Sequence, residues 1–132
     1  MRLPFTALLL LAGAPGEDSV ALPPPPDLHF DVPAGAPQEV QLRGINLAPG
    51  QSIALYVHPG VEMAYIVSGT IRFRMGAETQ VKHAGDSTLI PRGTPHAATN
   101  LGQEGARIVS AFVIDKGAQL RVPVGEDGNP LQ

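Results

Sequence analysis

The strongest constraint on this chain is the even spacing of its turn residues. From residue 38 to residue 114, glycine, proline and small polar residues interrupt the sequence about every 8 to 12 residues. Short runs of alternating apolar and polar residues lie between these turns, and no run has the 3.6-residue period of an amphipathic helix. The pattern predicts an all-β fold of many short strands, closed as a jelly-roll barrel.

One predicted strand carries two side chains of chemical interest on the same face. The segment Ser52–His58 has period 2, so Tyr56 and His58 point to one side of the strand and Ile53 points to the other. The next two residues, Pro59 and Gly60, are turn formers, so the chain is expected to reverse there.

The remaining strands follow from the same alternation. Gln38–Leu42 predicts a short strand followed by a turn over 44–50, and the apolar β-branched run Arg107–Ile114 predicts a buried strand. The apolar residues of these strands are the candidates for the core and for the lining of a pocket: Ile53, Leu55, Val57, Ile66, Phe73, Met75, Leu89, Ile108, Phe112 and Ile114.

Composition limits the classes of function. The chain has 132 residues, enough for one domain with terminal extensions. Its net charge of −3 and its pI near 5.7 give no basic patch, so we expect no nucleic-acid partner. There is no cysteine, which excludes disulfides and thiolate metal ligands.

The ends of the chain differ from its middle. Arg2 and the apolar stretch 3–14 are typical of a signal peptide, since a membrane-spanning helix needs about 20 residues. We therefore expect residues 1–21 to be a signal peptide, 22–37 a proline-rich arm, 38–124 the barrel and 125–132 a tail. The mature protein would be exported, periplasmic or secreted, without a stable membrane anchor. A start without structure is the alternative interpretation of the first residues.

Two segments of the predicted barrel resemble the paired motifs of the cupin family. The first family motif is a glycine, five residues, His-x-His, three or four residues, a glutamate, six residues and a glycine. The second is a glycine, five residues, Pro-x-Gly, two residues, a histidine, three residues and an asparagine. This chain matches at every fixed position but one, with the correct spacing: Gly50, His58, Glu62 and Gly69, then Gly85, Pro91, Gly93, His96 and Asn100.

The resemblance implies a metal site. His58, Glu62 and His96 would ligate one divalent ion inside the barrel, and two imidazoles with one carboxylate suit Fe, Mn, Ni, Cu or Zn. Each ligating imidazole is then expected to donate its other N–H to an acceptor that the sequence does not identify. His29 and His83 lie outside both motifs and are not expected to be ligands.

Tyr56 stands where the family pattern has its first histidine. Three roles are open for it. It could bind the metal as a phenolate, although an ordinary phenol has a pKa near 10. It could act as a catalytic residue that donates a proton or hydrogen bond to a substrate oxygen. It could also be a wall of the pocket, which would leave the metal with three protein ligands.

Cupins host many chemistries, so the resemblance leaves three classes of function open. The first is a metal-dependent enzyme, most simply a dioxygenase-type oxidoreductase acting on a small organic substrate, with isomerase, decarboxylase or lyase chemistry as variants. The second is a non-catalytic module that binds a small molecule or a metal. The third is a barrel whose metal is only structural. We also expect a homodimer, because exposed strand edges favour pairing.

Overall fold

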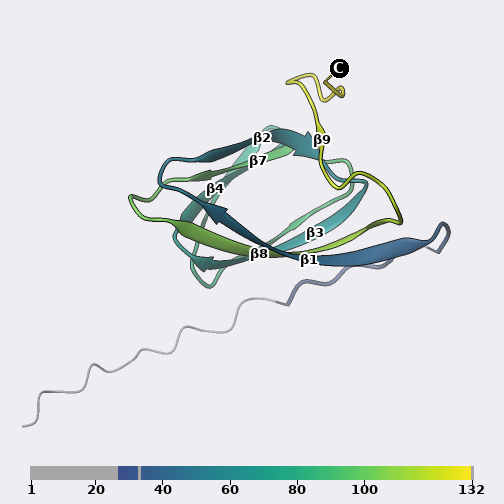
Figure 1. The fold of residues 1–132 in the computed structure, drawn as a ribbon, viewed down its shortest axis with the longest axis horizontal. Helices are drawn as coiled ribbons and strands as arrows, with labels where there is room; N and C mark the ends of the chain where they lie inside the picture. Colours follow the sequence, from purple (N-terminus) through teal and green to yellow (C-terminus); the bar gives the residue numbers. More distant parts are fainter. Residues whose placement is uncertain (1–26, 33, 132) are drawn as a thin grey trace, which may run out of the picture.

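The computed structural model describes residues 27–32 and 34–131 (Figure 1). Within these ranges the chain forms strands and no helix, which confirms the all-β prediction. The strands are β1 (Gln38–Leu47), β2 (Ser52–Val57), β3 (Gly60–Ser68), β4 (Thr70–Met75), β5 (Glu78–His83), β6 (Ser87–Ile90), β7 (His96–Asn100), β8 (Ala106–Asp115) and β9 (Val122–Pro123). In the described part of the chain, no helix could span a membrane. The predicted signal peptide 1–21 and the first residues of the arm lie outside the described ranges.

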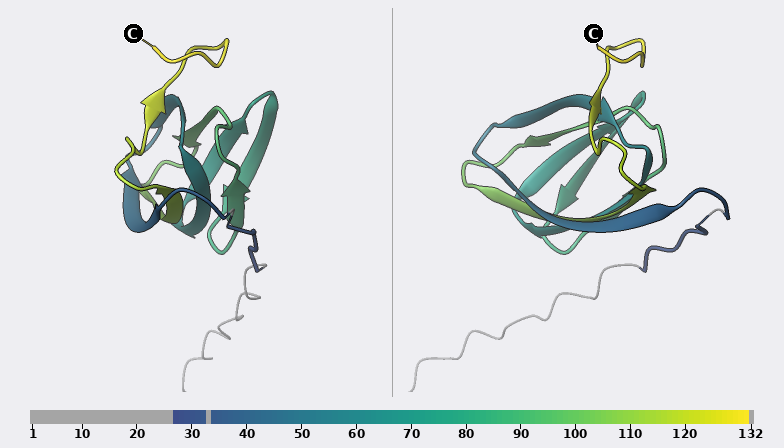
Figure 2. Two further views of the ribbon diagram at one scale, coloured as in Figure 1. Left: turned by 90° about the vertical axis from the view of Figure 1, so that its right-hand side faces the viewer. Right: turned by 45° about the vertical axis from the view of Figure 1, so that its right-hand side comes forward.

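Two antiparallel sheets face each other and form the barrel (Figures 1 and 2). One sheet has the order β1-β8-β3-β6, and the other has the order β5-β4-β7-β2-β9. Strands that are neighbours in the sequence alternate between the sheets over much of the chain, as a jelly roll requires. The side chains that point between the sheets form the core, and the site described below lies among them.

The first strand is longer than the sequence predicts. The turn expected over 44–50 is wrong at its start, because β1 continues to Leu47, opposite Ala106 of β8. Gly44 lies within the strand, and the turn is confined to the residues after Leu47, where Gln51 N donates to Ala48 O over 3.0 Å. The reason is tertiary: β8 offers hydrogen-bond partners along the whole of β1, and Leu47 is buried in the core.

The predicted orientation of Ile53 in β2 is wrong, because the strand contains a β-bulge. Ile53 was expected to point away from Tyr56, but the pairing of β2 with β7 shifts register between these two residues. Ile53 lies opposite Ala98 and Tyr56 lies opposite His96, so both face the interior although three positions separate them. The bulge aims Tyr56 into the barrel while Ile53 still packs against the core.

Some of the predicted core residues are buried, and other apolar residues join them in the core. Ile66, Phe73, Ile108, Phe112 and Ile114 are buried as expected. The candidates that are only partly buried are Ile53, Leu55, Val57, Met75 and Leu89. Apolar residues outside the list of candidates complete the interior: Leu47, Ala64, Ile71, Ile90, Ala98 and Ala106.

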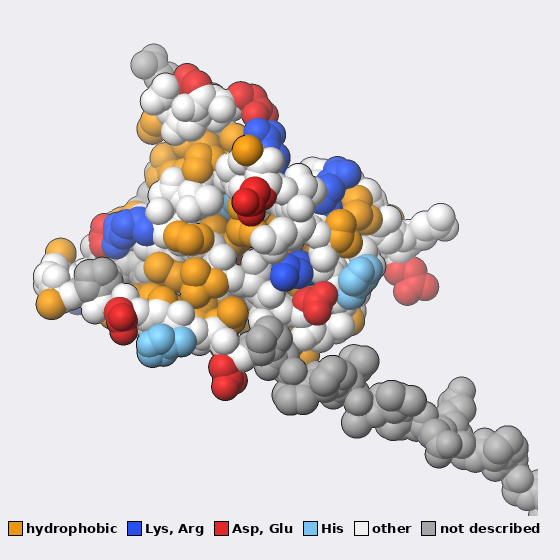
Figure 3. Space-filling model, turned by 180° about the vertical axis from the view of Figure 1, so that it is seen from behind, with side chains coloured by type: hydrophobic (Ala, Val, Ile, Leu, Met, Phe, Trp, Pro, Cys, Tyr) orange, Lys and Arg blue, Asp and Glu red, His pale blue; other side chains and the backbone are white. Residues whose placement is uncertain are grey.

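The surface is uneven in character. The space-filling view in Figure 3 shows hydrophobic side chains gathered over part of one face, with acidic and basic side chains around them.

At the C-terminal end, Val124 forms a bridge with Pro130, and Gly125 N donates to Asn129 O over 2.9 Å. The last described residues therefore fold back as a small loop.

Gly60 allows β3 to lie close to β8. A Cβ at this position would lie 2.0 Å from Val113 O and 2.5 Å from Ile114 Cα, both backbone atoms that cannot move aside separately. We expect Gly60→Ala to lower the free energy of unfolding by about 1 to 3 kcal/mol, the usual cost of overpacking. The midpoint of urea unfolding measures this loss.

Gly44→Ala is the matched control, since a Cβ there meets only Arg107 Nη2 at 3.7 Å. It lies in the same sheet, and we expect it to be close to neutral. Equal midpoints for the two variants would contradict the proposed close approach of β3 and β8.

Candidate metal centre

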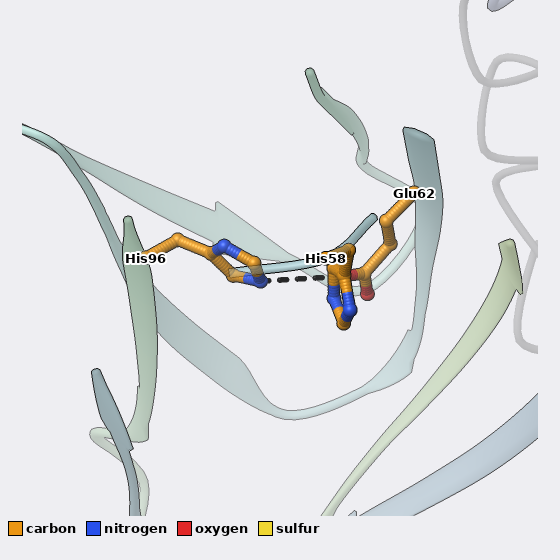
Figure 4. Close-up of side chains that lie close together, drawn as sticks. All are labelled: His58, Glu62 and His96. Atoms are coloured by element: carbon orange, nitrogen blue, oxygen red, sulfur yellow. Dashed lines mark hydrogen bonds and ion pairs between the residues drawn. The ribbon is translucent and has the colours of Figure 1, made fainter. Parts of the chain in front are cut away.

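Three polar side chains converge inside the barrel (Figure 4). His58 follows the last residue of β2, Glu62 lies in β3, and His96 begins β7. Their exposed fractions are 2%, 2% and 1%, so they are as buried as the apolar core. One nitrogen or oxygen atom from each lies within 4.8 Å of the other two. The structure thus brings together the three residues that the motifs predict as ligands.

The fold explains why residues so distant in sequence meet. At Pro59 the chain crosses from β2 in one sheet to β3 in the other, so His58 and Glu62 approach each other from the two sheets. Tyr56 of β2 pairs with His96 of β7, so the second motif lies beside the first across the same sheet. Gly93 N also donates to His58 O over 3.1 Å, which ties the loop before His96 to the turn after β2.

Backbone carbonyls fix the tautomer of both histidines. His58 Nδ1 lies 2.5 Å from Leu120 O, and His96 Nδ1 lies 2.8 Å from Thr94 O. A carbonyl oxygen can only accept, so each Nδ1 carries the hydrogen. The Nε2 atom of each ring is therefore the one that faces the interior, as expected for metal-binding histidines. These carbonyls are the acceptors that the sequence could not identify.

The three facing atoms need a cation between them. Glu62 Oε2 lies 2.8 Å from His58 Nε2 and 3.4 Å from His96 Nε2. When both imidazoles are neutral, both Nε2 atoms present lone pairs to a carboxylate, and His96 Nε2 makes no hydrogen bond. Either a proton or a metal ion relieves this repulsion. The donor set of two imidazoles and one carboxylate fits a divalent transition metal.

Glu62 keeps its negative charge in the interior. Burial by itself raises the pKa of Glu62, but hydrogen bonds from the His58 and His96 imidazoles outweigh it and lower the pKa to about 2. Such bonds need a hydrogen on Nε2, so this direction describes the centre in which a proton takes the place of the cation. The carboxylate is therefore ionised at neutral pH and able to act as a ligand without first losing a proton.

Tyr56 lies against both imidazoles. The centroid of its ring is 4.3 Å from that of His96 and 5.0 Å from that of His58. Burial and the charge of Glu62 raise the pKa of Tyr56 far above its ordinary value, while Arg121 acts in the opposite direction. The phenol thus keeps its proton at neutral pH in the protein without metal.

Sequence reasoning missed several residues around the centre. Leu120 and Thr94 act through backbone carbonyls, which no side-chain pattern reveals. Phe112 places its ring 4.8 Å from that of His58, and the guanidinium carbon of Arg121 lies 5.2 Å from the ring centroid of Tyr56. Arg121 follows a segment without periodicity, so only the structure shows that it reaches the site.

The other motif residue with a polar side chain has a structural role. Asn100 is fully buried and closes a turn: its Oδ1 accepts from Gly102 N over 2.9 Å. Its Nδ2 donates to Leu47 O and Glu104 O, which joins the end of β1 to the loop before β8. His29 and His83 lie apart from the centre; the first is beside Asp31 and the second beside Thr70.

Comparison with known proteins supports the family resemblance. The model of the cupin domain family matches residues 45–112, about half of the chain. No curated protein sequence matches this chain. A crystal structure of a conserved protein of unknown function from Streptococcus pyogenes is similar, with 26% identity, a TM-score of 0.55 and coverage of 59% of this chain and 67% of that one.

Two similar structures have descriptions that name a reaction. An oxalate oxidase in complex with the substrate analogue glycolate has 27% identity and a TM-score of 0.53, over 55% of this chain and 41% of that one. A predicted oxalate decarboxylase from Thermotoga maritima has 26% identity and a TM-score of 0.53, over 55% of this chain and 64% of that one. This chain thus spans less than half of the oxalate oxidase chain.

Removal of one imidazole tests the site. We expect His96→Ala to reduce bound metal from about one equivalent per chain to near zero, because two ligands cannot hold a divalent ion stably. Metal content is measured by elemental mass spectrometry on protein purified without a metal-affinity tag.

His83→Ala is the control, since His83 is exposed and lies outside the centre. It should retain the full equivalent. Full occupancy in His96→Ala, with the fold intact by circular dichroism, would show that the ligand assignment is wrong.

Proposed function

This chain belongs to the cupin family, and on that basis we propose that it is a metal-dependent oxidoreductase acting on a small organic acid. One observation carries the proposal: His58 and His96 both turn Nε2 toward Glu62, in a buried site where a cation is needed. Similarity to an oxalate oxidase and to a predicted oxalate decarboxylase supports an organic acid as the substrate.

His58, Glu62 and His96 would hold the metal. When bound, such an ion supplies a Lewis acid and a place for O₂ and substrate at its remaining coordination positions. The protein's own groups orient the ligands and set the charge of the centre. Leu120 O and Thr94 O hold the two imidazoles in the required tautomer, and the carboxylate of Glu62 lowers the positive charge of the centre.

Tyr56 is the group best placed to move a proton. Its ring contacts both imidazoles, and its raised pKa keeps the hydroxyl protonated at neutral pH. A neutral phenol can donate a hydrogen bond or a proton to a substrate oxygen beside the metal. Phe112 and the surrounding apolar side chains exclude water, which strengthens such an interaction.

The alternative is a cupin that binds a metal or small molecule without turnover. The low exposure of the three ligand side chains, 1% to 2%, is the observation that favours it. A structural metal site has no open coordination position, whereas a catalytic site keeps one.

Turnover separates the two functions. Protein loaded in turn with Fe, Mn, Ni, Cu or Zn is supplied with oxalate, glycolate and related acids, and O₂ uptake and loss of the acid are recorded. We expect turnover with one redox-active metal. Tyr56→Phe should retain the metal and lose about 100-fold in turnover, because it removes only the donated proton.

Three results would count against parts of this proposal. Loss of metal in Tyr56→Phe would identify Tyr56 as a ligand. Binding of an acid without turnover under any metal would favour the non-catalytic alternative. A structural site would be indicated if none of the acids binds to the metal-loaded protein and chelation of the metal lowers the melting temperature sharply.

A further inference from the structure

A cavity with two arginines lies next to the metal centre. It has a volume of about 480 Å³ and is lined by Arg43, Gly44 and Ile45 of β1 and by Gln119, Leu120 and Arg121 of the segment between β8 and β9. None of these residues is acidic. The cavity is of the size that small-molecule sites usually have, about 300 to 1,000 Å³.

The two arginines have spare capacity to bind an anion. Arg121 Nε is buried and has no hydrogen-bond partner, which is costly for a charged group. Arg43 donates through Nε and Nη2 to Gln41 Oε1, a neutral amide oxygen that leaves its charge uncompensated. Gln119 adds an amide on the same side and holds the segment by donating to Arg121 O over 2.8 Å.

The segment that lines this cavity also builds the metal centre. Leu120 O accepts the hydrogen of His58 Nδ1, and the next residue, Arg121, lies against the ring of Tyr56. Tyr56 in turn contacts the imidazoles of His58 and His96. The cavity and the centre are therefore linked through two adjacent residues, Leu120 and Arg121, which line the cavity and contact His58 and Tyr56.

We propose that Arg43 and Arg121 form a binding site for a small carboxylate anion beside the metal centre. Guanidinium groups bind carboxylates through paired, charge-assisted hydrogen bonds, and both arginines line the cavity with no acidic residue among its lining. The site deepens the proposed function by naming the substrate class, and only this link rests on the proposed function. The anion site itself requires no metal.

Calorimetric titration of oxalate and glycolate into the metal-free protein tests the site. We expect saturable binding by the full chain, weakened roughly tenfold or more in Arg43→Gln and in Arg121→Gln, since each loses a charge-assisted pair. Arg72→Gln, at an exposed position of β4, is the control and should bind as the original chain does. Arg43 is exposed, so its variant is expected to fold even where Arg121→Gln is not stable.

The outcomes are distinct from those of the turnover experiment. Unchanged binding in both arginine variants would overturn the proposal. So would binding that occurs only in metal-loaded protein and disappears in His96→Ala, because the acid would then be a ligand of the metal. Inorganic phosphate that binds as tightly as oxalate would overturn the assignment to carboxylates. Absence of turnover in the metal-loaded protein would not bear on this anion site, because the titration measures binding to the protein without metal.

A second and independent observation concerns the outer face of the sheet β1-β8-β3-β6. The strand registers align its outward side chains in rows that cross the sheet. These rows are Leu42, Ala111, Met63 and Leu89; Val40, Val113 and Val61; and Gly44, Val109, Tyr65 and Ser87. None of these residues is charged. The exposed fractions of Val40 and Leu42 are 72% and 74%.

Such a face is unusual for a sheet in contact with water. Antiparallel sheets commonly place polar residues on the solvated side and apolar residues on the other. The rows cover roughly 20 by 20 Å, on the order of 400 Å². A groove of about 260 Å³, lined in part by Phe30, Val61, Leu89 and Val113, continues the face at one end.

We infer that this outer sheet face is the interface with a second copy of the chain. The three apolar rows recur on an identical copy, so two copies can cover each other's rows, and Arg107 and Asp115, of opposite charge, lie at the two ends of the same face on β8. Two such sheets can pack face to face with their strands at about 30°. The rows cover about half of the roughly 800 Å² that each partner contributes to a standard interface, and the groove beside Phe30 extends the contact. This interface uses the face of the sheet, whereas the sequence predicted the strand edges.

Sedimentation of the full chain measures the assembly. We expect twice the chain mass of 13.8 kDa at micromolar concentration. Leu42→Glu should weaken self-association by roughly tenfold or more, because it places a charge in the apolar contact of both copies. Val81→Glu is the control, since Val81 is an exposed apolar residue, 48% accessible, on β5 of the other sheet.

A monomer at the highest soluble concentration would overturn the interface. A dimer that survives Leu42→Glu would also overturn it, since the contact must then lie elsewhere. Loss of the dimer in both variants would point to a general effect of charge and would count against this face.

Discussion

The buried charge of Glu62 is the constraint on which the centre of this molecule depends. A carboxylate that is 2% exposed costs several kcal/mol of desolvation unless cations or donors surround it. Here two imidazoles approach it, and two backbone carbonyls determine which nitrogen each imidazole turns toward it. The carbonyls remove the choice of tautomer, so the interior presents three acceptors that only a proton or a metal ion can reconcile.

The segment that follows β8 connects this centre to the surface. Leu120 positions His58, Arg121 lies against Tyr56, and both line the same cavity. A ligand that moves this segment would therefore act on a metal ligand and on the phenol at once.

The two faces of one sheet serve different purposes. The inner face of β3 carries Glu62 and Ile66 into the interior, while the outer face carries Met63 and Tyr65 toward solvent. Because side chains alternate along a strand, the same nine residues contribute to the metal centre and to the apolar outer surface. A sheet that is apolar on both faces resembles one that is covered on both sides.

The sequence alone determined the fold class and the three candidate ligands, because turn spacing, strand period and motif spacing are local properties. The tertiary structure decided where those patterns were insufficient. Pairing with β8 extended β1 through a segment rich in turn residues, and a bulge in β2 turned Ile53 and Tyr56 to the same side. The acceptors Leu120 O and Thr94 O and the approach of Arg121 to Tyr56 are invisible in sequence. They depend on backbone groups and on contacts between distant strands, which exist only once the barrel has closed.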